Sequence, residues 1–323
     1  MKNQVRDSLL GMAIGSALGL PYNTKYASSS RINPITDLLI DEDNQNALWS
    51  NDISLAFCLA DALTEGYDLN RIIDFYLDWF DNNLWSVTDR LLDKTIDTPT
   101  YKALEALKNN TFRSFNPERD LTNGSLKRIL PIVFYTWDKP LKVRFEIVKE
   151  LTELTHPDKI AVLANFYLVE FARYLLMGDS PRIAYLTLQE FMPILLKNLN
   201  FSQQEIEQFW RLFNSEIWHY DKQNINPSIN PIDSLEAALW AFLSSDSLID
   251  AILTAVNLGG NPETLGAITG GLAALYYGID NIPRNWLNNI ALKDKIEQLS
   301  EALYRLYLKD LQNKSTITAE ELL

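Results

Sequence analysis

Cysteine is nearly missing from this sequence: Cys58 is the only one among 323 residues. A disulfide framework and a cysteine-based metal site are therefore excluded. The surrounding Ser-Leu-Ala-Phe-Cys-Leu-Ala-Asp segment places the thiol at an apolar helical position, which predicts that it is buried and inert.

Long apolar runs are also missing, and glycine and proline are scarce. No stretch of about 18 apolar residues occurs, and charged residues interrupt the N-terminus where a signal peptide needs an apolar segment. We therefore expect no membrane-spanning segment and a reducing, cytoplasmic setting. Only 12 Gly and 13 Pro stand against 8 Trp, 14 Tyr and 14 Phe, which excludes a low-complexity or disordered chain.

Basic residues are outnumbered, with 29 Lys and Arg against 42 Asp and Glu and a formal net charge of -13. Such a surface repels phosphate backbones, so we expect no nucleic-acid partner. With 47% hydrophobic side chains the chain can bury a large core, and nothing in it resembles an interdomain linker. We predict a single domain over residues 1–323.

Helical spacing dominates what is present. Apolar residues recur at this spacing from Val5 to Leu18, where Gly19 and Pro21 end the first helix, and strand-like alternation is nearly absent. Further helices are predicted at about 52–65, 70–84, 99–109, 138–155, 158–177, 181–198, 203–214, 233–243, 246–257, 262–277 and 294–309. Polar segments predict loops at 21–47, 86–98, 109–123 and 215–232. The expected fold is all-α, a compact orthogonal multi-helix bundle.

Several separated segments resemble the ADP-ribosylglycohydrolase family, in that family's order. G-M-A-I-G-S-A-L-G at 11–19 is similar to G-x-A-x-G-D-A-L-G, with Ser16 in place of Asp. L-W-S-N-D-I-S-L-A at 48–56 is similar to the segment that carries T-D-D-T. T-N-G-S-L-K-R-I-L-P at 122–131 resembles S-N-G-x-x-M-R-x-x-P, and L-T-H-P-D at 154–158 resembles the family's T-H helix junction.

The last segment is the most specific. A-V-N-L-G-G-N-P-E-T-L-G-A-I-T-G-G-L-A-A-L-Y-Y-G at 255–278 resembles A-V-N-x-G-G-D-x-D-T-x-x-A-I-x-G-x-x-x-G-A-Y-Y-G, and I-P-R-N-W-L at 282–287 resembles the family's ending. The resemblance implies the helical fold of that family. It also implies hydrolysis of the N- or O-glycosidic bond between ADP-ribose and an ADP-ribosylated protein or small molecule.

Family members use two divalent cations, usually magnesium or manganese, which orient the ribose and stabilise charge at its anomeric carbon. The metal positions implied by the resemblance are Ser50, Asn51, Asp52, Asn261, Glu263 and Thr264. Each keeps an oxygen, but the carboxylates fall from four to two, so a two-metal site is disfavoured. One weakly bound Mg or Mn ion at Asp52 and Glu263, the implied catalytic pair, is the expected limit.

Helix capping is the competing interpretation of these polar residues. Ser50, Asn51 and Asp52 precede an apolar helix, and Asn261, Pro262 and Glu263 suit the cap and first turn of another. The expected ligand-binding residues have similar alternatives, a plain turn for the loop residues and a structural hydrogen bond for the histidine. They are Asn123, Gly124, Ser125, His156, Gly259 and Gly260.

Tyr276 and Tyr277 are expected to pack in the core rather than to stack on a ligand, and His219 has no motif around it.

Three functions remain open at this point. The first is an ADP-ribosylglycohydrolase-like enzyme with a degenerate metal site. The second is a protein that recognises ADP-ribose or a related nucleotide without turnover, because helix N-termini attract an anionic diphosphate without metal. The third is a non-catalytic interaction or immunity protein that occludes an ADP-ribosylating toxin or another partner, a role to which an acidic surface and the loops at 21–47 and 215–232 would be suited.

Overall fold

The chain folds into α-helices joined by loops and short 3-10 turns. The computed structural model describes residues 3–23, 33–43, 45–87, 96–109, 111, 121–199 and 201–314. Within these ranges the only β pairing is two isolated bridges, which confirms the all-α prediction. Parts of three predicted loops (24–32, 44, 88–95, 110 and 112–120) lie outside the described residues.

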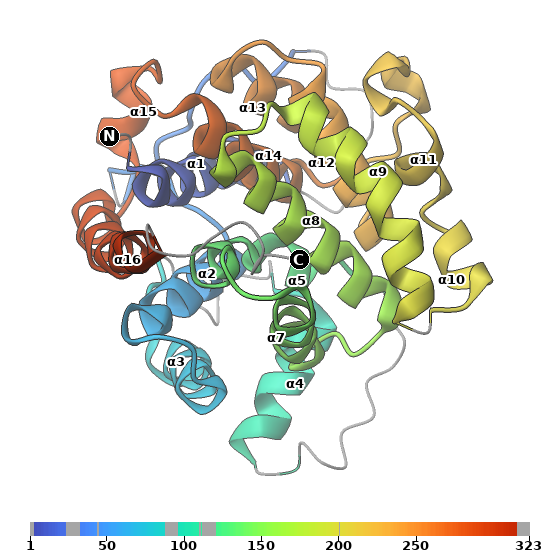
Figure 1. Cartoon of the computed structure of the whole chain (residues 1–323). Coiled ribbons are helices and arrows are strands. Elements are labelled where there is room, and N and C mark those ends of the chain that lie inside the picture. The colour runs from blue at the N-terminus through green and yellow to red at the C-terminus, as the bar shows by residue number, and fades with distance from the viewer. Residues whose placement is uncertain are drawn as a thin grey trace.

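The helices run through the whole described chain (Figure 1). Their bounds are α1 Gln4–Gly19, α2 Asn51–Ala62, α3 Leu69–Asn82, α4 Thr98–Lys108, α5 Gly124–Arg128, α6 Val133–Thr136, α7 Leu141–Glu153 and α8 Lys159–Met177. They continue as α9 Pro181–Asn198, α10 Gln203–Glu207, α11 Trp210–Asn214, α12 Pro231–Leu243, α13 Leu248–Val256, α14 Pro262–Tyr277, α15 Arg284–Asn289 and α16 Lys293–Lys314.

The helices depart from the predicted ones in three places, one of which is α15, Arg284–Asn289, where no helix was predicted. The predicted helix at 203–214 is two short helices, α10 and α11, of which the first begins at a capping box made by Ser202 and Glu205. The segment from Gly124 to Thr136 was not predicted as helix but contains α5 and α6. These helices are five and four residues long, too short to display a helical repeat of apolar residues.

The most extensive helix pair joins α1 to α14, which lie side by side in Figure 1. The two backbones touch: a Cβ atom at Gly15 would lie 1.9 Å from the Gly266 carbonyl oxygen, and one at Gly11 would lie 2.3 Å from that of Gly270. Only glycine permits this approach. The contact sets the C-terminal end of α1 against the first turn of α14.

Helix α8 crosses the middle of the molecule and is the central core helix (Figure 1). It is long and apolar enough to span a membrane, but 83% of its most apolar window is buried inside the protein. Near its middle the Glu170 carboxylate accepts two hydrogen bonds from the Arg144 guanidinium of α7, at 2.6 and 2.7 Å. Apolar burial and this ion pair hold α7 against α8.

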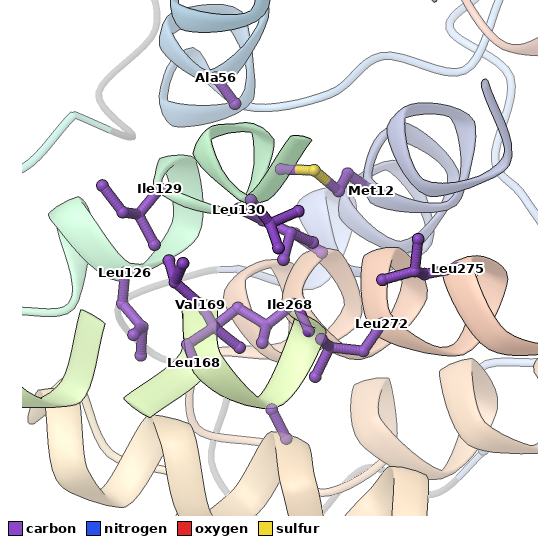
Figure 2. Close-up of a cluster of buried hydrophobic side chains, with 14 of the residues drawn as sticks. Met12, Ala56, Leu126, Ile129, Leu130, Leu168, Val169, Ile268, Leu272 and Leu275 are labelled. Carbon is purple, nitrogen blue, oxygen red and sulfur yellow. The ribbon is translucent and has the colours of Figure 1, made fainter. Parts of the chain in front are cut away.

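An apolar layer fixes the short helix α5 between α2, α8 and α14 (Figure 2). Leu126, Ile129 and Leu130 share one face of the α5 segment. They belong to the same apolar cluster as Val169 of α8 and Ile268 of α14. Residues at positions i, i+3 and i+4 face the same way, so the intervening Lys127 and Arg128 point elsewhere. The apolar layer therefore sets the direction of two basic side chains.

The tyrosine pair packs against the core, and the histidine without a motif lies on the surface. Tyr276 and Tyr277 are partly buried and contact the Phe242 ring, and the Tyr277 hydroxyl donates to the Ser245 carbonyl at 3.1 Å. His219 lies on the surface, 3.2 Å from Glu216. Cys58 is buried, as predicted.

The buried carboxyl of Glu236, in α12, makes the stability of the protein depend on pH. Burial raises the pKa of Glu236 to about 7 from 4.5, although Arg211 lies 3.2 Å away. Because the folded state holds this proton more tightly, its stabilising contribution is present below pH 4.5 and is lost as pH rises to about 7. Glu236→Gln should therefore stabilise the protein at pH 8, by on the order of 2 kcal/mol, and change little at acid pH.

Urea unfolding of both proteins at acid and alkaline pH measures this difference. Glu207→Gln is the matched control, since Glu207 is exposed on α10. This substitution should leave the free energy of unfolding unchanged at both pH values. If Glu236→Gln has the same pH dependence as the wild type, the buried carboxyl is not the group responsible.

Candidate functional site

The predicted metal positions gather where the N-terminal ends of α2 and α14 meet the C-terminal half of α1. Ser50 and Asn261 occupy the N-cap positions of α2 and α14, as the capping interpretation requires. Neither side chain accepts a hydrogen bond from its own helix, however. The capping interpretation is correct for the positions and wrong for the side chains.

The Ser50 hydroxyl reaches across to the other helix instead. It donates a hydrogen bond to Oε1 of Glu263, and the Ser16 hydroxyl donates to the same oxygen at 3.3 Å. Ser16 Oγ also accepts the Ser50 backbone N–H at 3.1 Å. A hydrogen bond to a carboxylate is stronger than one to a neutral group, so the first turns of α2 and α14 are tied together through Glu263.

Two basic residues of α5 complete the cluster. Lys127 Nζ lies 2.7 Å from Asp52 Oδ2 and 3.4 Å from Glu263 Oε2. Arg128 Nη1 donates to Asp52 Oδ1 at 2.9 Å, and Nη2 donates to the Thr155 hydroxyl. The side chains of the two basic residues are 4% and 3% exposed, and both carboxylates are fully buried. Two acids and two bases thus form a neutral buried ion cluster, which we call the Lys127 cluster (Asp52, Lys127, Arg128 and Glu263).

Burial and charge oppose each other within the Lys127 cluster. Burial by itself would lower the pKa of Lys127, but Asp52 and Glu263 raise it above its usual value, so the ammonium stays charged. Burial raises the pKa of Asp52, and the nearby cations Lys127 and Arg128 oppose that rise. Each charge therefore depends on its partners inside the protein.

This donor set does not fit a pair of divalent cations. A bridging cation would need the Asp52 and Glu263 oxygens that the Lys127 ammonium already contacts. An added dication about 4 Å from that ammonium would be repelled by roughly 8 kcal/mol at an effective dielectric of 20. In the described part of the chain, no group of three or more His, Cys, Asp or Glu residues could hold a metal. No catalytic step through a metal can be derived from this arrangement.

A second polar group adjoins the Lys127 cluster. His156 Nε2 lies 3.0 Å from Asp97 Oδ2 and 2.8 Å from the Thr122 hydroxyl, while Nδ1 lies 2.8 Å from the Thr155 hydroxyl. Burial would raise the pKa of Asp97, but His156 lowers it well below its usual value. Both His156 ring nitrogens are engaged within the protein, which favours its structural role. The Asp97 side chain is 16% exposed, so it is more accessible than Asp52 and Glu263, which are fully buried.

The predicted ligand-binding loop is held by its own side chains. Asn123 is the N-cap of α5 and donates to the Ser234 hydroxyl at 2.7 Å. The Ser125 hydroxyl accepts from Asn165 at 2.8 Å. A Cβ atom at Gly124 would lie 2.0 Å from the Asp97 carboxylate, so any other residue there would displace that side chain. The loop turns into α5, and its two polar side chains make hydrogen bonds within the protein.

Of the remaining predicted site residues, the two glycines form a turn and the three polar residues are buried. Gly259 and Gly260 have φ values of 86° and 63°, which glycine tolerates, and a Cβ at Gly260 would meet the Pro227 carbonyl oxygen. They make a turn into α14 beside the 225–231 loop. Asn51 and Thr264 are buried next to Asp52 and Glu263 of the Lys127 cluster. Asn261 Oδ1 is buried without a hydrogen-bond partner in the described residues.

The sequence-based prediction missed the basic half of the site. The signal was present in the T-N-G-S-L-K-R segment, where Lys127 stands at the Met of the family pattern. A charged residue at an apolar position beside the ligand motifs indicates a buried partner. Asp97 had no comparable signal, since it follows a polar segment without a motif.

Comparison with known proteins gives one family. A family model described as ADP-ribosylglycohydrolase matches residues 1–312. A solved structure titled ADP-ribosylglycohydrolase-related protein complex superimposes with a TM-score of 0.75 at 25% identity, covering 95% of this chain and 99% of that one.

Curated relatives agree with that result. ADP-ribosylarginine hydrolase Tri1 of Serratia proteamaculans is 27% identical over 308 residues, which are 94% of this chain and 79% of the relative. ADP-ribosyl-[dinitrogen reductase] glycohydrolase of Rhodospirillum rubrum is 23% identical over 176 residues, which are 54% of this chain and 53% of that protein.

Proposed function

The chain belongs to the ADP-ribosylglycohydrolase family, and we propose that it recognises ADP-ribose-containing ligands while its hydrolase activity is weak or lost. Family membership supports the ligand class, an ADP-ribosylated protein or small molecule. The proposed setting is the cytoplasm, which the single buried Cys58 suits.

One observation carries the loss of activity: the Lys127 ammonium contacts both Asp52 and Glu263. Catalysis in this family typically depends on metal ions that position the ribose and stabilise developing charge. The Asp52 and Glu263 carboxylates are already paired with bases from α5, so they are poor ligands for a further cation. Nor is either carboxylate exposed as a general base, because both side chains are fully buried.

Calorimetry with ADP-ribose in the presence of a chelator tests recognition directly. We expect saturable binding without metal and no tightening when magnesium or manganese is added. Release of ADP-ribose from an ADP-ribosylated arginine peptide should be at least about 10³-fold slower than with an active relative assayed in parallel, because metals supply several kcal/mol of barrier lowering.

Each outcome separates the candidate functions. Efficient magnesium-dependent release would contradict the proposed loss of activity. Absence of ADP-ribose binding under all conditions would contradict recognition and leave a non-catalytic interaction or immunity role. Ribose 5-phosphate is the control ligand, since it lacks the adenosine monophosphate part of ADP-ribose.

A further inference from the structure

We propose that the Lys127 ammonium is a covalently attached replacement for the family's divalent cations, and that this one side chain makes the protein independent of metal. The inference deepens the proposed function and rests on its loss of metal-dependent catalysis. Lys127 then has a structural role, which is to hold the first turns of α2 and α14 together.

The position of Lys127 supports this role. Its Nζ contacts Asp52 in the first turn of α2 and Glu263 in the first turn of α14, while its backbone belongs to α5. One ammonium therefore connects three helices that are far apart in the sequence. A cation between two carboxylates does the same in a metal site, where it offsets their mutual repulsion.

Charge balance supports the same role. Asp52 and Glu263 contribute two negative charges, and Lys127 with Arg128 contributes two positive ones. Of the two bases, only Lys127 contacts Glu263. A neutral residue at position 127 would leave the Glu263 carboxylate buried without a cation, which destabilises the fold and which a bound cation would relieve.

Lys127→Met tests this directly, because methionine fills similar space without charge. In a chelator, we expect its melting temperature to fall by on the order of 5–15 °C. Millimolar magnesium or manganese should restore a few degrees, because an ion that binds only the folded state raises its stability. The wild-type melting temperature should be the same with chelator and with either metal, and calorimetry of the wild type should show no metal heat.

Two further variants keep the result interpretable. Lys149→Met makes the same change on the surface of α7, where Lys149 lies 3.9 Å from Glu146, and should neither melt early nor respond to metal. Lys127→Met combined with Glu263→Gln removes the uncompensated carboxylate, so it should melt higher than Lys127→Met and lose the metal response.

The inference would be overturned by tight, stoichiometric metal binding to the wild type, or by a Lys127→Met variant that responds to metal no more than Lys149→Met. Should Lys127→Met not fold, the wild-type titration and the double variant decide the matter. ADP-ribose binding is measured separately, so its loss contradicts the proposed function without bearing on Lys127.

Discussion

Asp52→Ala is expected to lower the free energy of unfolding by about 3–5 kcal/mol, the cost of breaking a buried ion pair from one side. Asp52 is the one acid that contacts both bases of the Lys127 cluster, through Lys127 at 2.7 Å and Arg128 at 2.9 Å. Its removal leaves Lys127 with Glu263 at 3.4 Å and Arg128 with neutral hydroxyl groups. Denaturant unfolding measures the loss.

Asp81→Ala is the matched control for this change. Asp81 also pairs with a lysine, Lys108, but both side chains are more than a third exposed. Solvent screens such a pair, so its loss should cost less than about 1 kcal/mol. Equal stability of the two variants would show that the buried charges contribute nothing specific. A large difference would mean that Asp52, a ligand position in the family, has a structural role in this protein.

Gly270→Ala should be the second large effect, with a loss of about 2–4 kcal/mol in unfolding free energy. A Cβ atom there would lie 2.2 Å from the Gly11 carbonyl oxygen and 3.0 Å from its carbon, so α1 and α14 must move apart. Backbone atoms cannot rotate away as side chains do. The intrinsic preference of helices for alanine over glycine, about 1 kcal/mol, offsets only part of this cost.

The neighbouring Gly271→Ala separates the contact from the helix preference. A Cβ at Gly271 would meet Leu130 Cδ2 at 2.5 Å and Met12 Cγ at 2.7 Å, which are parts of flexible side chains. The change in stability should stay within about 1 kcal/mol, since these groups can change rotamer. Thermal melts of both variants decide the matter. Equal destabilisation would indicate that helix separation is not what limits stability.

The sequence predicted helix starts well because their determinants are local. Asn261, Pro262 and Glu263 begin α14 at the cap and first turn, as their residue types indicate. The order of the family-like segments also brought Ser50, Asp52 and Glu263 to one place, because the resemblance covers most of the chain. Neighbouring residues determine where a helix starts, and the order of the motifs is visible in the sequence itself.

Side-chain partners were harder to predict, since they depend on distant segments. Ser50 was a metal position by resemblance and a cap of α2 by the competing interpretation, yet its hydroxyl donates to a buried carboxylate of α14, which is a strong acceptor. Lys127 lies on a helix of five residues, whose facing is set by the apolar layer around Leu126 and Leu130. No local pattern could show that its ammonium reaches two other helices.

The contact between α1 and α14 also constrains how the protein is made. The Ser8 hydroxyl donates to the Gly271 carbonyl across a separation of 263 residues. At a synthesis rate of 5–20 residues per second, α14 follows α1 out of the ribosome after roughly 13 to 50 s. Nearly every residue of α1 is buried in the finished molecule, so during this interval the nascent chain exposes an apolar helix without its partner. A chain truncated before α14 would keep this apolar segment exposed, which favours aggregation.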